Sequence, residues 1–143
     1  RGTEIDQQLI SQHSVNWIKE EFPGGGDIIL FNNRTIDLGS KILQLSVSIE
    51  DSTFNIQEDQ TFLPAAPSWT YSEGSFFSNI QSGSFRLHNG NTLISLGDGV
   101  EMFEINNGDS VVWSYSFSGP SGQYFNGTYQ DIKNLIHTTL IIH

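Results

Sequence analysis

Apolar and polar residues alternate along several short segments of the chain, a pattern typical of β-strands with one buried face. In residues 42–49, Leu43, Leu45, Val47 and Ile49 are predicted to point to one side, and the glutamine and serines between them to the other. Glycine, asparagine and aspartate separate these segments, as expected for strands joined by turns. The pattern predicts a half-buried strand here and an all-β fold for the chain.

The strongest hairpin signal is Asn89-Gly90, which lies between two segments, 85–87 and 92–96, with apolar residues at alternate positions. Such a dipeptide accepts the positive φ angles of a type I′ turn. Two further strands are expected at 100–105, with Phe103 and Ile105 on one face, and at 110–115, with Val111, Trp113 and Tyr115 on one face. Four short strands in about 35 residues predict an antiparallel meander of the size of one β-propeller blade.

The preceding part of the chain repeats this order, with strands expected at 14–18, 27–33, 41–49 and 68–71. Both fourth strands contain Trp-x-Tyr, and Trp69 and Trp113 are 44 residues apart, which is within the usual period of a blade. We therefore predict two consecutive blades.

The boundaries follow from this alignment. The first blade spans 11–72 and carries an inserted polar loop at 50–67, the second spans 82–116, and a tail at 117–143 has no assigned structure. Insertions in loops cost little free energy in a repeat architecture.

Composition supports strands and restricts the partners. Fourteen glycines, ten phenylalanines and three tryptophans favour strands and turns over helices. The formal charge of -10, from six Lys and Arg against sixteen Asp and Glu, argues against a nucleic-acid partner. The sequence contains no run of about 18 apolar residues, so it predicts no membrane span. With no cysteine, disulfides, thiol nucleophiles and thiolate zinc sites are excluded.

Several segments together resemble a known family. They are "QHSVNWI", a glycine-rich turn, "DIILFNN", "PSWTYS", "FFSNIQSGSFRLHNGNTLIS" and "MFEINNGDSVVWSYS". This ordered set, over roughly residues 11–116, is similar to the bacterial arylsulfotransferase-type β-propellers, specifically the aryl-sulfate sulfotransferase-like branch. In that family a blade begins with a His-Asp-like pair, passes an Asn-Gly-Asn turn and ends near Val-Trp-x-Tyr.

The resemblance implies a six-bladed propeller that moves a sulfuryl group between phenolic compounds through a histidine. The expected small-molecule partners are an aryl sulfate and a phenol, no cofactor or metal is expected, and the location is periplasmic or extracellular. The chain opens without an apolar signal segment, so a leader is expected to lie outside it or to have been removed. Two blades do not close a ring, so we expect further blades or self-association to complete it and the isolated chain to be inactive.

His13 is the candidate catalytic residue. The resemblance places it at the start of the first strand of a blade, which lines the central channel in the family. Sulfuryl transfer needs a neutral nucleophile near pH 7, which an imidazole supplies. Ser14 replaces the family's aspartate, so the neighbouring position does not supply a carboxylate to orient the ring. The alternative is a packing or capping role for His13 at a strand end.

Arg86 is the candidate substrate-binding residue, because a guanidinium holds the oxygens of a sulfonate in a bidentate manner. Its alternative is an exposed arginine beside a turn. We interpret His88, next to Asn89-Gly90, as structural. His137 and His143 lie in the tail and receive no role.

Other chemistry is less well supported by the sequence. Asp and Asn cluster in turns at 97–101 and 106–109, but their spacing matches no calcium loop. The glycines at 24–26 lack the Lys-Ser/Thr of a phosphate-binding loop. Besides the enzyme, two functions stay open: a non-catalytic propeller segment that binds a carbohydrate or a protein, and a lectin-like β-sandwich module.

Overall fold

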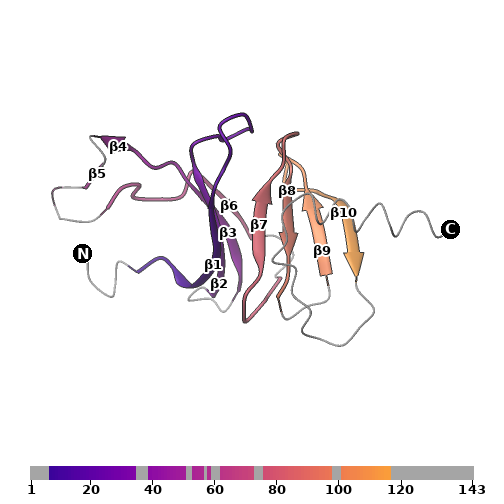
Figure 1. Cartoon of the computed structure of the whole chain (residues 1–143). Coiled ribbons are helices and arrows are strands. Elements are labelled where there is room, and N and C mark those ends of the chain that lie inside the picture. The colour runs from indigo at the N-terminus through magenta and orange to yellow at the C-terminus, as the bar shows by residue number, and fades with distance from the viewer. Residues whose placement is uncertain are drawn as a thin grey trace.

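The computed structural model of the chain is built from β-strands (Figure 1). It describes residues 7–34, 39–50, 53–56, 58, 62–72, 76–97 and 101–116. Within these ranges there are ten strands and no helix. Eight strands form two four-stranded antiparallel sheets, and the other two form a short hairpin. The all-β prediction is therefore confirmed, whereas the predicted tail at 117–143 lies outside the described residues.

Each sheet is a meander that follows chain order, β1-β2-β3-β6 in the first sheet and β7-β8-β9-β10 in the second. Neither sheet closes on itself, since β1, β6, β7 and β10 are edge strands. The first sheet consists of β1 (Ile10–Trp17), β2 (Ile28–Arg34), β3 (Lys41–Leu45) and β6 (Trp69–Tyr71). The second consists of β7 (Gly83–Arg86), β8 (Thr92–Ser95), β9 (Glu101–Ile105) and β10 (Val111–Ser116).

The two sheets pack face to face around one hydrophobic core (Figure 1). Because side chains alternate between the two faces of a strand, each sheet contributes every second residue to this core. Phe31 and Ile42 of the first sheet and Ile94 and Ile105 of the second are each 0% exposed. Phe76, from the segment that connects the sheets, lies against Phe31 and Phe103, with ring centroids 5.8 and 5.9 Å apart. The remaining buried members of the core are Ile18, Ile29, Tyr71 and Phe103.

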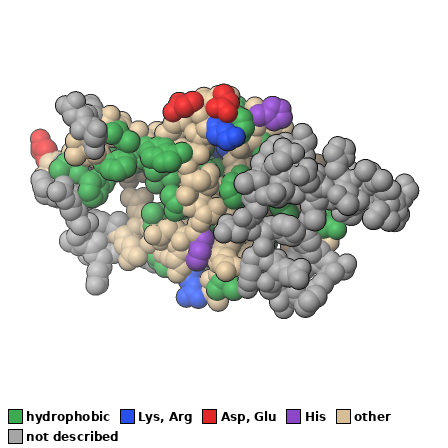
Figure 2. Space-filling view, in the orientation of Figure 1, with side chains coloured by type: hydrophobic (Ala, Val, Ile, Leu, Met, Phe, Trp, Pro, Cys, Tyr) green, Lys and Arg blue, Asp and Glu red, His purple; other side chains and the backbone are tan. Residues whose placement is uncertain are grey.

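An arm leaves the first sheet within the predicted insertion at 50–67. It contains the hairpin of β4 (Ile49–Glu50) and β5 (Thr53–Phe54) and a bridge between Ile56 and Phe62. The arm extends on the side of the first sheet that faces away from the second (Figure 1). Hydrophobic side chains are visible on its surface in Figure 2. The exposed large hydrophobic residues of this segment are Ile49, Phe54, Ile56, Phe62 and Leu63.

The predicted strand at 42–49 is wrong in length and in burial. The strand β3 ends at Leu45, and Ile49 already belongs to the arm. Ile42 and Leu43 are only 0% and 5% exposed although they point to opposite faces. Both faces of the first sheet are therefore covered at this strand, which a simple alternation of polar and apolar residues does not anticipate.

The hairpin at Asn89-Gly90 is confirmed, but its predicted type I′ turn is wrong. Only Gly90 has a positive φ, of 89°, whereas a type I′ turn needs two such residues. The amide of Gly90 donates to the carbonyl of Leu87 at 3.0 Å, and the amide of Leu87 donates to the carbonyl of Asn91 at 2.8 Å. These bonds define a three-residue loop in which a tight turn is followed by a left-handed glycine.

The prediction that Val111 shares a face with Trp113 is also wrong. The register of β10 against β9 shifts between these residues, so that Val111 lies opposite Ile105 and Trp113 opposite Glu104. Ile105 and Glu104 are consecutive and point to opposite faces of β9. The extra residue of this bulge turns Trp113 away from the first sheet.

The two sheets are built to the same plan. Trp69 lies opposite Gln44 in the first sheet, and Trp113 lies opposite Glu104 in the second. In each sheet the tryptophan ring stacks on the tyrosine two residues later, with centroids 6.4 Å apart in the first and 6.3 Å in the second. The indoles therefore occupy equivalent places in the two sheets.

Candidate functional site

The candidate site lies on the neighbouring edge strands of the two sheets, β1 and β7. The side-chain amide of Asn16 in β1 donates to the carbonyl of Ser84 in β7 at 3.1 Å. A side chain thus takes the place of a backbone ladder between the two strands. Side chains of these two edge strands line the boundary between the sheets. His13, in β1, is one of them.

The backbone of β1 is distorted on both sides of His13. Ser11 and Ser14 have positive φ angles of 56° and 52°, in the left-handed region that residues other than glycine rarely adopt. The register with β2 shifts between His13 and Asn16, so β1 contains a bulge. Bulges and left-handed residues re-aim side chains and are concentrated near functional sites. The distortion holds His13 at the junction of the two sheets.

The hydrogen bonds of His13 determine which ring nitrogen carries the proton. Its Nδ1 lies 2.8 Å from Oδ1 of Asn33 and 3.1 Å from the carbonyl oxygen of Ser11. The Asn33 amide is oriented by its own Nδ2, which donates to the carbonyl of Ser78 at 2.9 Å. Both neighbours of Nδ1 are therefore acceptors, and Nδ1 must be the donor. In the neutral ring the lone pair is then on Nε2.

The orienting residue Asn33 belongs to a buried polar network. It is 0% exposed, and its carbonyl accepts a hydrogen bond from the hydroxyl of Ser40 at 2.8 Å. The amide of Ser78 donates to the same hydroxyl at 3.0 Å. Ser78 lies in the segment that leads into β7. The network therefore ties Asn33, which bonds the ring of His13, to the first sheet and to the segment that precedes the second. A buried, satisfied network of this kind limits the ring to one orientation.

We predict that neutral His13 is found in the Nδ1–H tautomer. In a nitrogen-15 NMR spectrum at a pH where the ring is neutral, Nε2 is expected to show the shift of an unprotonated nitrogen. Asn33→Ala removes the nearer acceptor and is expected to shift the population toward the Nε2–H form. A protonated Nε2 in the unsubstituted chain would contradict this assignment.

The second sheet has no histidine at the equivalent place. His13 pairs with the fourth residue of β2, and Gly83 pairs with the fourth residue of β8. A Cβ atom at Gly83 would lie 3.1 Å from Oγ of Ser14, tighter than most such contacts. Because Gly83 has no side chain, the bulge of β1 can approach β7. Of the two equivalent positions, the one in the first sheet carries an imidazole and the one in the second sheet carries none.

The predicted substrate-binding residue Arg86 makes contacts inside the interface between the sheets. Its Nη1 donates to the carbonyl of Gly90 at 2.8 Å, and its Nη2 donates to Oε1 of Gln44 at 2.6 Å. The guanidinium carbon lies 5.1 Å from the ring centroid of Trp69. Arg86 thus links β7 to β3 and β6 of the first sheet.

Burial lowers the pKa of Arg86, and the nearby carboxylates of Asp109 and Asp27 partly oppose this effect. The Nε atom of the guanidinium is buried and makes no hydrogen bond. Desolvation of the cation therefore outweighs its attraction to the two carboxylates. A guanidinium so engaged has little capacity left for a sulfonate.

The structure does not bring Arg86 and His13 together. Arg86 is the last residue of β7, whereas His13 is the counterpart of Gly83, the first. Three residues of a strand span about 10 Å. The two predicted site residues therefore belong to opposite ends of the junction between the sheets.

The other candidates are dispersed. His88 is exposed in its turn, and Figure 2 shows the described histidines far apart on the molecule. His137 and His143 lie outside the described residues. The residues that sequence reasoning missed are Asn33 and Gln44, whose roles depend on strand register.

In the described part of the chain, no three His, Cys, Asp or Glu side chains are grouped so that they could hold a metal ion. The same part of the chain has no helix with the length and hydropathy needed to cross a membrane. No family model, no curated protein and no solved structure matches the chain.

Proposed function

We propose that the chain forms two adjacent blades of an arylsulfotransferase-like β-propeller and that His13 is the residue that carries the sulfuryl group. The observation that carries the proposal is the geometry of His13: Nδ1 is held by Asn33 and Ser11, which leaves Nε2 as the nucleophilic nitrogen. Two equivalent four-stranded sheets with adjacent edge strands support the propeller. The proposed family carries with it an export route to the periplasm or beyond.

The proposed reaction has two steps. The Nε2 lone pair of His13 attacks the sulfur of an aryl sulfate, the bond from sulfur to the aryl oxygen breaks, and the phenolate leaves. The hydroxyl oxygen of an acceptor phenol then attacks the sulfur, the nitrogen–sulfur bond breaks, and the phenolic proton passes to solvent. Throughout, Nδ1–H stays hydrogen-bonded to Oδ1 of Asn33, which stabilises the positive charge that the sulfurylated ring acquires.

In this proposal Asn33 takes the role that the family's aspartate has next to the histidine. A neutral amide oxygen orients the ring as a carboxylate does but stabilises the cationic ring less. The replacement of the aspartate by Ser14 is therefore compensated across the sheet, from β2, and not by a neighbour in the sequence.

A second candidate function is a propeller segment that binds a carbohydrate or a protein without catalysis. One observation favours it: the guanidinium of Arg86 is already engaged by Gly90, Gln44 and Trp69. A sulfuryl-transfer site needs cations or donors around the sulfonate oxygens. In the second candidate function, Arg86 stabilises the interface between the two sheets, and His13 is one of several residues that contact the bound carbohydrate or protein.

The test uses p-nitrophenyl sulfate with a phenol as acceptor. We expect nitrophenol release from a longer protein that contains this chain in a complete propeller, and none from the chain alone, because two sheets do not enclose a channel. Peptide mass spectrometry of the enzyme stopped without acceptor is expected to place a sulfuryl group on His13. If neither the chain nor the complete propeller releases nitrophenol, the binding function is favoured instead.

A further inference from the structure

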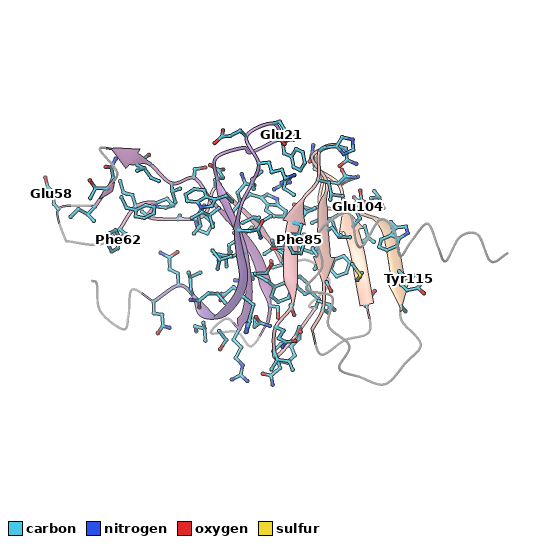
Figure 3. The ribbon with its side chains drawn as sticks, viewed as in Figure 1. Glu21, Glu58, Phe62, Phe85, Glu104 and Tyr115 are labelled. Atoms are coloured by element: carbon cyan, nitrogen blue, oxygen red, sulfur yellow. The ribbon has the colours of Figure 1, made fainter. Side chains whose placement is uncertain are left out.

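Asparagine is followed by glycine at two places in the described part of the chain, Asn89-Gly90 and Asn107-Gly108, while Asn126-Gly127 lies outside it. The first pair is in the turn between β7 and β8, and the second is in the turn between β9 and β10. Figure 3 labels Glu104 and Tyr115 on the two strands that the second turn joins. The same dipeptide can therefore be compared in two hairpins of one sheet.

An Asn-Gly pair can lose ammonia without an enzyme. The backbone nitrogen of the glycine, after giving up its proton, forms a bond to Cγ of the asparagine. The bond from Cγ to Nδ2 then breaks, and ammonia leaves with a proton taken from solvent. Water opens the resulting ring at one of its two carbonyl carbons, which leaves aspartate or isoaspartate. Glycine favours the attack because it has no Cβ to obstruct it and few conformational restrictions, so the remaining control on the rate is the turn itself.

The turn at Asn89 restrains both reacting groups. Oδ1 of Asn89 accepts a hydrogen bond from the backbone amide of Asn91 at 3.0 Å. Gly90 is buried, and its amide donates to the carbonyl of the buried Leu87 at 3.0 Å. A buried and hydrogen-bonded amide gives up its proton only when the structure opens locally. The fold is therefore expected to slow the attack at Asn89.

The turn at Asn107 restrains the same groups less. Asn107 and Gly108 are both exposed, and the Asn107 side chain makes no hydrogen bond within the described part of the chain. The amide of Gly108 donates to Oδ1 of Asn106 at 2.9 Å, and the same oxygen accepts from the amide of Ser110 at 3.1 Å. The bond from Gly108 is exposed, so water competes for it. The attack at Asn107 is therefore expected to proceed in the folded chain.

The turn that contains Asn107 also carries a contact between the two sheets. Asp109 is held in the left-handed region, with φ 59°, and its Oδ1 accepts from the indole Nε1 of Trp69 at 3.2 Å. The amide of Asp109 donates to the carbonyl of Asn106 at 3.0 Å. Isoaspartate at position 107 adds one carbon atom to the main chain between these two bonded residues, and it adds a negative charge beside Asp109. Both changes are expected to displace the Asp109 carboxylate from the indole.

We propose that Asn107 is a site of spontaneous deamidation and that its isoaspartate product weakens the contact of Asp109 with Trp69. The hydrogen bonds and burial of the two turns make Asn107 the faster site and Asn89 the slower one. This inference depends on the two hairpins and on the packing of the sheets. It does not depend on a complete propeller or on sulfuryl transfer.

The test is peptide mass spectrometry of the full chain after incubation in mildly alkaline buffer, both folded and in concentrated urea. In urea, Asn89 and Asn107 are expected to deamidate at similar rates, because the unfolded chain no longer holds the two turns. In the folded chain, Asn107 is expected to react several-fold faster than Asn89. An isoaspartate-specific methyltransferase distinguishes isoaspartate from aspartate. Equal rates at the two positions in the folded chain, or a faster rate at Asn89, would overturn the proposal.

Gly108→Ala is the matched variant. A Cβ atom at this position would lie 3.4 Å from Oδ1 of Asn106, an ordinary contact, and Gly108 is not among the glycines with a positive φ. The fresh variant is therefore expected to have a Tm close to that of the parent chain. Its added methyl group obstructs the attack on Cγ, so deamidation of Asn107 is expected to become several-fold slower. A fresh variant that deamidates at Asn107 as fast as the parent chain would contradict the proposed route.

The effect on the contact between the sheets is measured on the isoaspartate form after ion-exchange separation. Its Tm is expected to be a few degrees lower than that of the unmodified chain. Asn107→Asp adds the charge without the extra main-chain carbon, and its expected loss is smaller. In Trp69→Phe, which lacks the indole donor, the isoaspartate form is expected to differ less from its unmodified parent. Equal losses in the Trp69 and Phe backgrounds, or no loss in either, would overturn the predicted effect on the Asp109 contact.

Discussion

Replacing Phe31 by alanine is expected to lower the free energy of unfolding by about 3–5 kcal/mol, the usual cost of emptying a buried phenylalanine site. Phe31 is 0% exposed and belongs to the core between the two sheets. Its ring meets that of Phe76 at an interplanar angle of 69°, the edge-to-face geometry that adds to area burial. The cavity left behind borders both sheets, so neither can close it alone.

Urea unfolding monitored by circular dichroism measures this effect. The control is Phe54→Ala on the arm, where the ring is 46% exposed, and its expected change is within about 0.5 kcal/mol. Equal effects of the two substitutions would contradict the position of Phe31 in a core shared by both sheets.

Replacing His13 by alanine is expected to abolish nitrophenol release by the complete propeller, because the proposed reaction has no other nucleophile. Asn33→Ala is expected to reduce kcat by about 10–100-fold, the typical cost of losing a residue that orients a reacting imidazole. The imidazole remains in this variant, but its Nδ1–H loses the nearer acceptor, which lies at 2.8 Å.

The neighbouring Asn32 provides the control for Asn33. Asn32 is also buried, but its side chain hydrogen-bonds to the backbone of Ile10 and Gln8, whereas Asn33 bonds to the ring of His13. Asn32→Ala is therefore expected to lower stability while kcat of the folded fraction stays unchanged. If the two asparagine variants lose kcat equally, Asn33 does not act through His13.

The strand order of the fold could be predicted from alternation and turn residues, since these are local properties. The alignment of Trp69 with Trp113 rests on the same local pattern, and the registers bear it out. The turn at Asn89-Gly90 differed because an Asn-Gly pair serves two loop geometries that local sequence does not separate. The bulge before Trp113 was missed because it depends on the register with β9.

The site was less predictable because its partners come from distant strands. The motif indicates His13, but the residue that orients it, Asn33, is 20 positions away and meets it only through the pairing of β1 with β2. The sequence predicts that Arg86 binds a sulfonate, with an exposed arginine beside a turn as the alternative, whereas the packing of the sheets directs its guanidinium to Gln44, 42 positions away. Contacts of this kind follow from tertiary packing and leave no periodic signal in the sequence.

The packing of two equivalent sheets face to face is the claim on which the rest depends, and a double-mutant cycle between Tyr71 and Phe103 tests it. These rings come from different sheets, and their centroids lie 6.3 Å apart. With both residues changed to leucine, singly and together, the predicted coupling is about 0.5–1.5 kcal/mol. The control pair is Tyr71 with Leu87, which belongs to a separate hydrophobic cluster and is expected to be additive. A coupling of zero between Tyr71 and Phe103 would contradict the stacked arrangement.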